Sequence, residues 1–198
     1  MRIVYRVFAL GFFGFFRLLV NLILTKLTFP KARLIRMPFF IRREGKIIIG
    51  NGFTANAGLI LDTYGKDSQI ILDENVQANY RLHIGACSSV TIGSGTLFGS
   101  DCLVMDHSHG SYGPDIHSSP ETPPQKRDLF SKPISIGKNC WFGDRVAILP
   151  GVTIGDGVVV GVGSVVTTNL PSNVVAVGSP ARIVKRYDIE TKSWLIES

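Results

Sequence analysis

Small and aliphatic residues recur at every sixth position along much of the chain. The recurrence comes in four runs, which begin at Ile49, Leu72, Ile92 and Ile136. The positions are Ile49, Ala55, Leu61, Leu72, Ala78, Ile84, Ile92, Phe98, Val104, Ile136, Phe142, Ile148, Ile154, Val160 and Val166. A helix repeats its faces every 3.6 residues and a strand every two, so neither element alone gives this spacing. A six-residue period predicts short strands that return to the same place by turning corners.

Glycine and small polar residues follow many of these positions. Two instances are Ile92-Gly93-Ser94-Gly95 and Ile154-Gly155-Asp156-Gly157. Glycine tolerates the positive φ angles that tight corners need. We therefore predict a triangular solenoid of about five coils with three legs each, in which each coil pairs with the next by parallel hydrogen bonds. At about 4.8 Å per coil, the stack is on the order of 24 Å long.

The six-residue period has one long interruption, between Val104 and Ile136. A repeat that only stacks has no need of such an arm, and long insertions in compact domains often carry function. The interruption contains the sequence Asp106-His107-Ser108-His109. We predict an extended loop over residues 105–133 and take its histidines as the first candidates for chemistry.

The two ends of the chain fall outside the repeat. Residues 1–45 form an apolar and basic segment, predicted to be helical, in which Arg17 and Lys26 interrupt the apolar runs. Each run is shorter than the roughly 20 residues that a spanning helix needs. We therefore expect residues 1–30 to lie in a membrane interface, or else to pack on their own domain or within an oligomer. The repeat domain covers residues 46–187. The tail, residues 188–198 with Trp194, is expected to cap the last coil as a short helix.

Composition and charge narrow the choice of partners. The chain has 198 residues, 45% of them hydrophobic, which suffices for one domain with a core. Its net charge of +6 favours anionic partners, such as a membrane surface at the basic N-terminus and a phosphate-bearing cofactor at Arg182 and Lys185. No nucleic-acid-binding motif accompanies the charge, so nucleic acid is not an expected partner. Three cysteines without a CxxC spacing predict free thiols and a cytoplasmic protein.

Four segments in a fixed order resemble the hexapeptide-repeat acetyltransferases. They are residues 133–143 (PISIGKNCWFG), 148–155 (ILPGVTIG), 161–167 (GVGSVVT) and 178–182 (GSPAR). The resemblance covers residues 46–187 and is nearest to the galactoside and maltose O-acetyltransferases and their polysaccharide-modifying relatives. It implies an all-β fold, the left-handed parallel β-helix, and assembly as a homotrimer. It also implies that acetyl-CoA binds in clefts between adjacent subunits and that no metal is required.

The resemblance implies roles for individual residues. The loop histidine that acts as general base in the family corresponds to His107 or His109, and Asp106 is placed to orient an imidazole. The residues that match the family's cofactor path are Asn79, Trp141, Asp144, Val162, Thr167, Thr168, Arg182 and Lys185. Asp144 stands where relatives often have serine, so a role near the thioester falls to its backbone N–H. Thr168 stands where relatives often have lysine, which removes one phosphate contact.

The implied reaction moves an acetyl group from acetyl-CoA to a sugar hydroxyl. A histidine takes the hydroxyl proton as the oxygen attacks the thioester, and then protonates the leaving thiolate. The apolar N-terminus and the long arm favour a bulky or lipid-linked acceptor from surface polysaccharide biosynthesis, at the inner face of the cytoplasmic membrane. Two alternatives stay open, a non-catalytic scaffold and a gamma-type carbonic anhydrase that would draw its zinc ligands from His83, His107 and His109.

Overall fold

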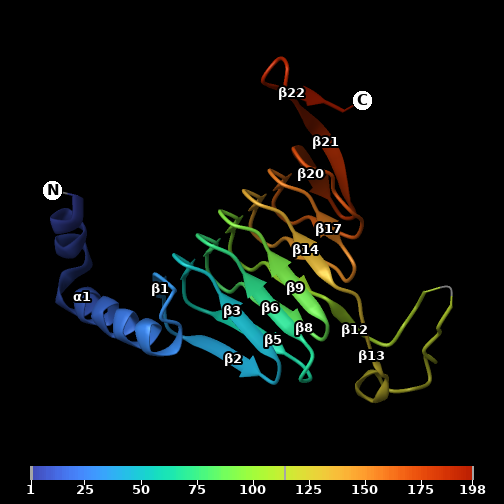
Figure 1. The fold of residues 1–198 in the computed structure, drawn as a ribbon, viewed down its shortest axis with the longest axis horizontal. Coiled ribbons are helices and arrows are strands. Elements are labelled where there is room, and N and C mark those ends of the chain that lie inside the picture. Colours follow the sequence, from blue (N-terminus) through green and yellow to red (C-terminus); the bar gives the residue numbers. More distant parts are fainter. Residues whose placement is uncertain (1, 114, 198) are drawn as a thin grey trace.

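The structure, a computed structural model, describes residues 2–113 and 115–197, with side chains described from residue 11 onward. One helix, α1 (Arg2–Thr28), precedes a stack of short strands that wind into a triangular solenoid (Figure 1). Within the coils, from β1 to β20 and apart from the inserted arm, consecutive strands belong to different sheets, and each strand pairs in parallel with the strand one coil away. The six-residue period arises because each leg consists of one short strand and one corner.

Three sheets, here called faces A, B and C, form the sides of the solenoid. In spatial order, face A contains β1 (Leu34–Ile35), β4 (Thr54–Ala55), β7 (Gln77–Ala78), β10 (Leu97–Phe98), β15 (Trp141–Phe142), β18 (Val159–Val160), β20 (Val174–Gly178), β21 (Ala181–Asp188) and β22 (Ser193–Ile196). Face B contains β2 (Phe39–Arg43), β5 (Leu59–Thr63), β8 (His83–Ala86), β11 (Leu103–Met105), β16 (Ala147–Ile148) and β19 (Val165–Val166). Face C contains β3 (Lys46–Ile49), β6 (Gln69–Leu72), β9 (Ser89–Ile92), β14 (Ile134–Ile136) and β17 (Thr153–Ile154).

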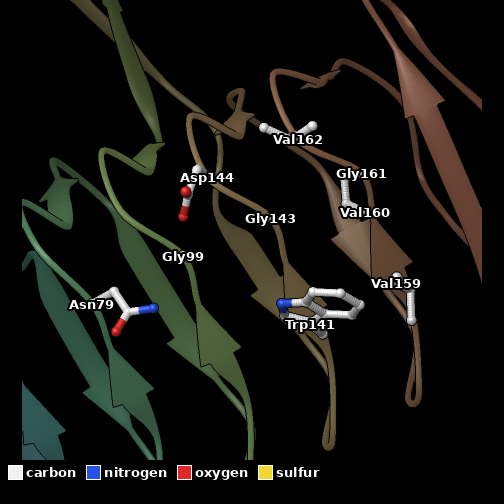
Figure 2. A pocket seen from close by; sticks show the side chains of 9 residues that line it. All are labelled: Asn79, Gly99, Trp141, Gly143, Asp144, Val159, Val160, Gly161 and Val162. Carbon is white, nitrogen blue, oxygen red and sulfur yellow. The ribbon is translucent and has the colours of Figure 1, made fainter.

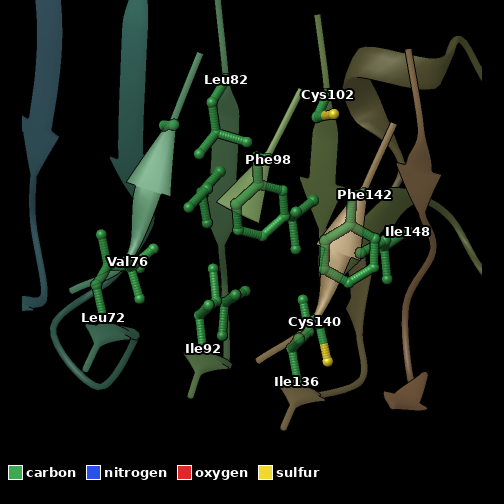
Figure 3. Close-up of a cluster of buried hydrophobic side chains, with 14 of the residues drawn as sticks. Leu72, Val76, Leu82, Ile92, Phe98, Cys102, Ile136, Cys140, Phe142 and Ile148 are labelled. Atoms are coloured by element: carbon green, nitrogen blue, oxygen red, sulfur yellow. The ribbon is translucent and has the colours of Figure 1, made fainter. Parts of the chain in front are cut away.

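The core lies inside the prism, where inward residues of successive coils stack in columns. Parallel pairing in register places Phe98 beside Ala78 on one side and Phe142 on the other. The rings of Phe98 and Phe142 are stacked, with centroids 4.8 Å apart and planes 16° from parallel (Figure 3). Cys102 and Cys140 are buried in the same core as free thiols. The stack as a whole therefore buries the apolar residues that no single coil could cover.

The solenoid is longer than the five coils predicted from the sequence. Face A alone holds seven strands in parallel, β1 to β20. At the N-terminal end, Ile35 and Ile41 begin two further legs, which are six residues apart and pair with the next coil. The step from Ile41 to Ile49 is eight residues instead of six, so the period is broken there. At the other end, Leu170 pairs with Ile154 although it is off the six-residue spacing. Because the corners at both ends of the solenoid differ in length from the regular ones, the six-residue period did not predict these legs.

The predicted C-terminal cap helix is wrong, because the tail forms an antiparallel ribbon. β20 pairs with β21, and β21 pairs with β22, both antiparallel. Gly178, with a φ of +103°, lies where the chain reverses between the first two. A strand offers backbone partners to the open edge of face A, which a helix cannot do. Tyr187 packs edge-on against Trp194 in the ribbon, with ring centroids 5.2 Å apart.

The long interruption leaves the solenoid after β11 and returns at β14. Within it, β12 (His107–His109) pairs antiparallel with β13 (Leu129–Ser131), and a short 3-10 helix, η1 (Pro124–Lys126), lies between them. Figure 1 shows this arm projecting from the side of the stack. The two strands hold the base of the arm together, so its first residues are fixed against the coil that they leave.

Candidate active site

A buried carboxylate marks the base of the arm. Asp106 follows β11 directly and is excluded from solvent. Its two carboxylate oxygens accept hydrogen bonds from the backbone N–H groups of Cys87 (2.7 Å) and Ser88 (2.8 Å), in the matching corner of the preceding coil. Its carbonyl oxygen accepts from the N–H of Lys132 (2.8 Å), where the arm returns. Asp106 is therefore fixed by the neighbouring coil and by the far end of the arm.

The imidazole of His107 is held against this carboxylate. Its Nδ1 lies 3.1 Å from Oδ1 of Asp106, and 9% of the side chain is exposed. Tyr64 packs edge-on against the imidazole, with a centroid distance of 5.1 Å. An ionised carboxylate accepts hydrogen bonds and donates none, so Nδ1 carries the proton and Nε2 keeps its lone pair. This is the tautomer that a histidine needs to act as a general base.

His109, the other candidate base, has a different setting. It lies two residues further along β12, is exposed, and faces Leu129 across the hairpin. The hydroxyl of Tyr112 donates to the carbonyl oxygen of His109 (2.7 Å), which is a contact of its backbone and not of its ring. A carboxylate that orients the ring is found at His107, so the geometry favours His107 as the base.

Cys87 lies at the same corner, although nothing in the sequence analysis singled it out. Its sulfur, a carboxylate oxygen of Asp106 and a ring nitrogen of His107 all lie within 4.8 Å of one another. Burial, followed by the negative charges of Asp106 and Glu44, raises the pKa of the Cys87 thiol to about 11. A neutral thiol is a poor nucleophile and a poor metal ligand. This setting disfavours a reaction through an acylated cysteine.

The spacing of the coils is the signal that could have found Cys87. At this end of the solenoid, successive coils begin 23 and 20 residues apart, at Ile49, Leu72 and Ile92. Residues at the same corner therefore recur at these intervals. Tyr64, Cys87 and His107 follow that spacing and meet at one corner.

The arrangement of the histidines does not fit a zinc site within one chain. Among the described residues, one cluster is compact enough to share a metal ion, and it contains a single histidine, His107. His83, which a gamma-type carbonic anhydrase would need, instead places its Nε2 3.1 Å from a carboxylate oxygen of Asp62.

A pocket of about 450 Å³ lies at another edge of the solenoid, where face A turns into face B (Figure 2). It is lined by Asn79, Gly99, Trp141, Gly143, Asp144, Val159, Val160, Gly161 and Val162. Four of these residues were predicted to contact the cofactor: Asn79, Trp141, Asp144 and Val162. The whole lining comes from the strands and corners of four successive coils, which explains why residues far apart in the sequence come together.

Glycines line this pocket because the coils approach closely there. A Cβ atom at Gly99 would lie 2.6 Å from the backbone nitrogen of Asp144, and one at Gly143 would lie 2.8 Å from that of Val162. The carboxylate of Asp144 turns toward the preceding coil and accepts from the N–H of Ser100 (2.6 Å). The hydrogen bonds found among the described residues do not use the backbone N–H of Asp144. Asp144 therefore lines the pocket with a backbone N–H that is free of these hydrogen bonds, and its role toward a thioester stays a prediction.

The predicted phosphate-binding residues lie beyond the pocket along face A. Arg182 and Lys185 are exposed on β21, where Arg182 pairs with Val177 and Lys185 with Val175 of β20. Val177 in turn approaches Gly161 of the pocket, because a Cβ atom on that glycine would lie 2.8 Å from the Val177 side chain. Strands in a sheet are about 4.8 Å apart, so these cations stand roughly 10 Å from β18.

Two predicted cofactor residues and the candidate base lie at a different edge from the pocket. Thr167 and Thr168 follow β19 and are exposed where face B turns toward face C, so the structure does not bring them into the pocket. His107 follows β11 at this same edge. The pocket and the Asp106–His107 pair are therefore separated by the width of face B within one chain.

Comparisons with known proteins agree with this architecture. Residues 133–168 match the family described as the hexapeptide repeat of succinyl-transferase. Over 185 residues the chain is 45% identical to WbbJ of Escherichia coli (strain K12), a protein assigned to lipopolysaccharide biosynthesis as an O-acetyl transferase, and the match covers 93% of this chain and 94% of that protein.

Two solved structures extend the comparison. Galactoside acetyltransferase, solved with coenzyme A, is 30% identical, with a TM-score of 0.54 over 80% of this chain and 70% of that one. A variant of AntD, an N-acyltransferase from Bacillus cereus solved with dTDP-4-amino-4,6-dideoxyglucose and coenzyme A, is 22% identical, with a TM-score of 0.68 over 85% and 89% of the two chains. At that identity the second match concerns the fold alone. The left-handed parallel β-helix predicted from the sequence is confirmed by these matches.

Proposed function

Because the chain belongs to the hexapeptide-repeat acetyltransferases, we propose that it transfers the acetyl group of acetyl-CoA to a sugar hydroxyl, with His107 as the general base. The observation that carries the proposal is the buried Asp106 carboxylate, 3.1 Å from Nδ1 of His107. It leaves Nε2 of His107 as the basic atom. Because Asp106 is fixed by two backbone N–H groups, it holds the ring in place without moving itself.

The proposed reaction carries one proton from the acceptor hydroxyl to His107 and then to the departing thiolate. Nε2 of His107 takes the proton of the acceptor hydroxyl while the hydroxyl oxygen attacks the acetyl carbonyl carbon. The carbon–sulfur bond then breaks, and the imidazolium returns the proton to the departing thiolate. Asp106 stabilises the imidazolium between the two transfers and is not itself protonated. Cys87 stays a neutral thiol throughout, because its raised pKa leaves little thiolate near neutral pH.

The pocket at the edge of faces A and B supports binding of acetyl-CoA. Its walls are apolar at Trp141 and Val162, which suits the pantetheine arm, and the backbone N–H of Asp144 is available to the carbonyl oxygen of the thioester. Arg182 and Lys185 continue the line along face A and suit the phosphates at the nucleotide end. The relative galactoside acetyltransferase was solved with coenzyme A, which agrees with this assignment.

A neighbouring copy of the chain completes the proposed site. His107 and the pocket lie at different edges of one solenoid, so the base of one chain serves the pocket of the next, as expected for the homotrimer implied by the family. Light scattering of the purified protein tests this assembly. Three chains of 21.6 kDa give a mass of about 65 kDa, and a stable 21.6 kDa monomer with full activity would contradict it.

The acceptor in this proposal is a sugar of a surface polysaccharide, in its lipid-linked form. Its support is the identity to WbbJ across nearly the whole length of both chains. The arm begins with β12, which contains His107, and projects from the stack (Figure 1), so in this proposal the chain of sugars lies along the arm.

Mass spectrometry of surface polysaccharide tests the proposed function. Cells with the intact gene should carry an O-acetyl group that is absent in cells without it. Restoration by the His109→Ala variant and failure by the His107→Ala variant are the expected pattern. An unchanged polysaccharide after loss of the gene would contradict the acceptor class.

A further inference from the structure

Helix α1 presents its polar residues to the protein. Asn21 is 3% exposed and Thr25 is fully buried. The N–H of Met37 donates to Oδ1 of Asn21 (2.9 Å), and the N–H of Ile35 donates to Oγ1 of Thr25 (2.9 Å). These bonds dock the helix on the first coil. Asn21, Thr25 and Phe29, each four residues apart, thus define the packed side of the helix and the turn that follows it.

The opposite side of α1 is a stripe of exposed apolar side chains. Phe12 and Leu27, at its two ends, are 81% and 77% exposed. The members of the stripe, at helical spacing, are Phe12, Phe16, Leu19, Val20, Ile23 and Leu27. A helix on the surface of a water-soluble protein normally turns its apolar side inward. The reversed arrangement here indicates that the stripe meets an apolar environment outside the chain.

The two cations of this helix segment are turned back toward the protein. Nη2 of Arg17 donates to the carbonyl oxygen of Met37 (3.2 Å). Nζ of Lys26 donates to the carbonyl oxygens of Pro30 (3.0 Å) and Ala32 (2.7 Å), beyond the C-terminal end of the helix. The apolar stripe can therefore enter a nonpolar layer while both charges keep polar partners.

Charge around the helix identifies the layer as an anionic surface. The first 43 residues contain nine Lys and Arg and no Asp or Glu, whereas the other 155 contain 12 Lys and Arg and 15 Asp and Glu. A second pocket, of about 380 Å³, lies at this end of the solenoid between the end of α1 and β3. Phe29 and three isoleucines of β3 line it together with Lys31 and Arg43. Apolar walls beside two cations suit a lipid with an anionic headgroup.

We infer that α1 lies in the plane of a membrane that contains anionic lipids, with the stripe in the acyl boundary and the basic residues 31–43 at the headgroups. By length and composition, Gly11–Thr28 also qualifies as a candidate membrane span, with a mean hydropathy of 1.4. However, Gly11 breaks the helix, and the remainder is about 26 Å long at 1.5 Å per residue, short of the roughly 30 Å of a bilayer core. Its packed side, bonded to the first coil, also prevents lipid from surrounding it. The inference is independent of the acetyl-transfer proposal.

Flotation with lipid vesicles in a density gradient tests the inference on the full-length protein. The wild type should float with vesicles of phosphatidylglycerol and phosphatidylcholine, and less so at high salt or with phosphatidylcholine alone. The double variant Phe16→Glu and Ile23→Glu should bind roughly 30-fold more weakly, because two apolar side chains more than half exposed are replaced by charges. The control, Ile189→Glu with Ile196→Glu, also replaces two exposed apolar side chains by glutamate, but in the C-terminal tail, and should float like the wild type.

Three results would overturn the inference. They are a wild type that does not float, a helix variant that floats as well as the wild type, and a control that loses flotation equally. A second copy of the chain is the competing occupant of the stripe. If the helix variant lowered the mass seen by light scattering while the wild type ignored vesicles, the stripe would be a subunit contact. Because both substituted side chains are exposed, the melting temperature of the variant should stay near that of the wild type and verify its folding.

Discussion

Replacement of Asp106 by asparagine tests how the buried carboxylate supports the base. Three donors converge on its two oxygens: the N–H groups of Cys87 at 2.7 Å and Ser88 at 2.8 Å, and Nδ1 of His107 at 3.1 Å. An amide of the same shape supplies one accepting oxygen and adds an NH2 group. Whichever way the asparagine amide is turned, its NH2 group takes the place of one carboxylate oxygen, so at least one of the three donors then faces an NH2 donor instead of an acceptor.

The structure sets the size of two effects for Asp106→Asn. A buried donor without an acceptor costs about 1–3 kcal/mol of unfolding free energy, and each kcal/mol lowers the melting temperature of a chain of this size by about 2–4 °C. His107 also loses the charge that stabilises its imidazolium, so the acetyl-transfer rate should fall by roughly 10²-fold or more. Differential scanning calorimetry and a coenzyme A release assay measure the two effects.

A matched change at Asp67, which is exposed in the turn between β5 and β6, serves as the control. Asp67→Asn should leave both the melting temperature and the rate close to those of the wild type. The reasoning about the carboxylate would be refuted if Asp106→Asn melted and turned over like the wild type.

Three further outcomes are expected. Because the pKa of the Cys87 thiol is raised to about 11 from 9.0, iodoacetamide at pH 8 should alkylate Cys87 about 10²-fold more slowly in the folded than in the unfolded protein, and equal alkylation rates would contradict this pKa. The contribution of the neutral Cys87 thiol to the free energy of unfolding should be full below pH 9 and should be lost as the pH rises toward 11. Phe142→Ala empties a buried, stacked position and should cost about 3–5 kcal/mol in urea unfolding, whereas a loss below about 1 kcal/mol would show that the column is not the core. Arg182→Gln with Lys185→Gln should raise KM for acetyl-CoA roughly tenfold with kcat nearly kept, less so at high salt, and an unchanged KM would place the phosphates elsewhere.

The repeat could be predicted from the sequence because its period is set by backbone geometry. Every leg from Ile49 to Val166 lies where the six-residue period placed it, apart from the arm. The first legs, at Ile35 and Ile41, were missed because two extra residues in the next corner disturb the spacing. The C-terminal ribbon was missed for a different reason. The tail forms strands because it can pair with the open edge of face A. That edge is made by other parts of the chain, so the tail sequence alone does not reveal it.

The candidate site could be predicted only in part. Asp106 and His107 were found because the arm interrupts the period beside them. The partners of Asp106 are backbone groups of Cys87 and Ser88, and a backbone donor leaves no signature in a sequence. For a similar reason, the sequence did not show that α1 turns its polar side toward the protein and its apolar side outward. Asn21 faces the protein because it accepts a hydrogen bond from the backbone N–H of Met37, and such a backbone donor is not visible in a sequence.

The rates of acetyl transfer by His107→Ala and His109→Ala, measured side by side on purified protein, decide whether His107 is the general base. Acetyl-CoA binding by calorimetry should be similar in both, because neither histidine lines the pocket that we assign to the cofactor. His107→Ala should lose at least about 10²-fold in kcat, the usual scale for a general base, while His109→Ala should stay within a few-fold of the wild type. A reversed order, with His107→Ala active and His109→Ala inactive, would contradict this assignment.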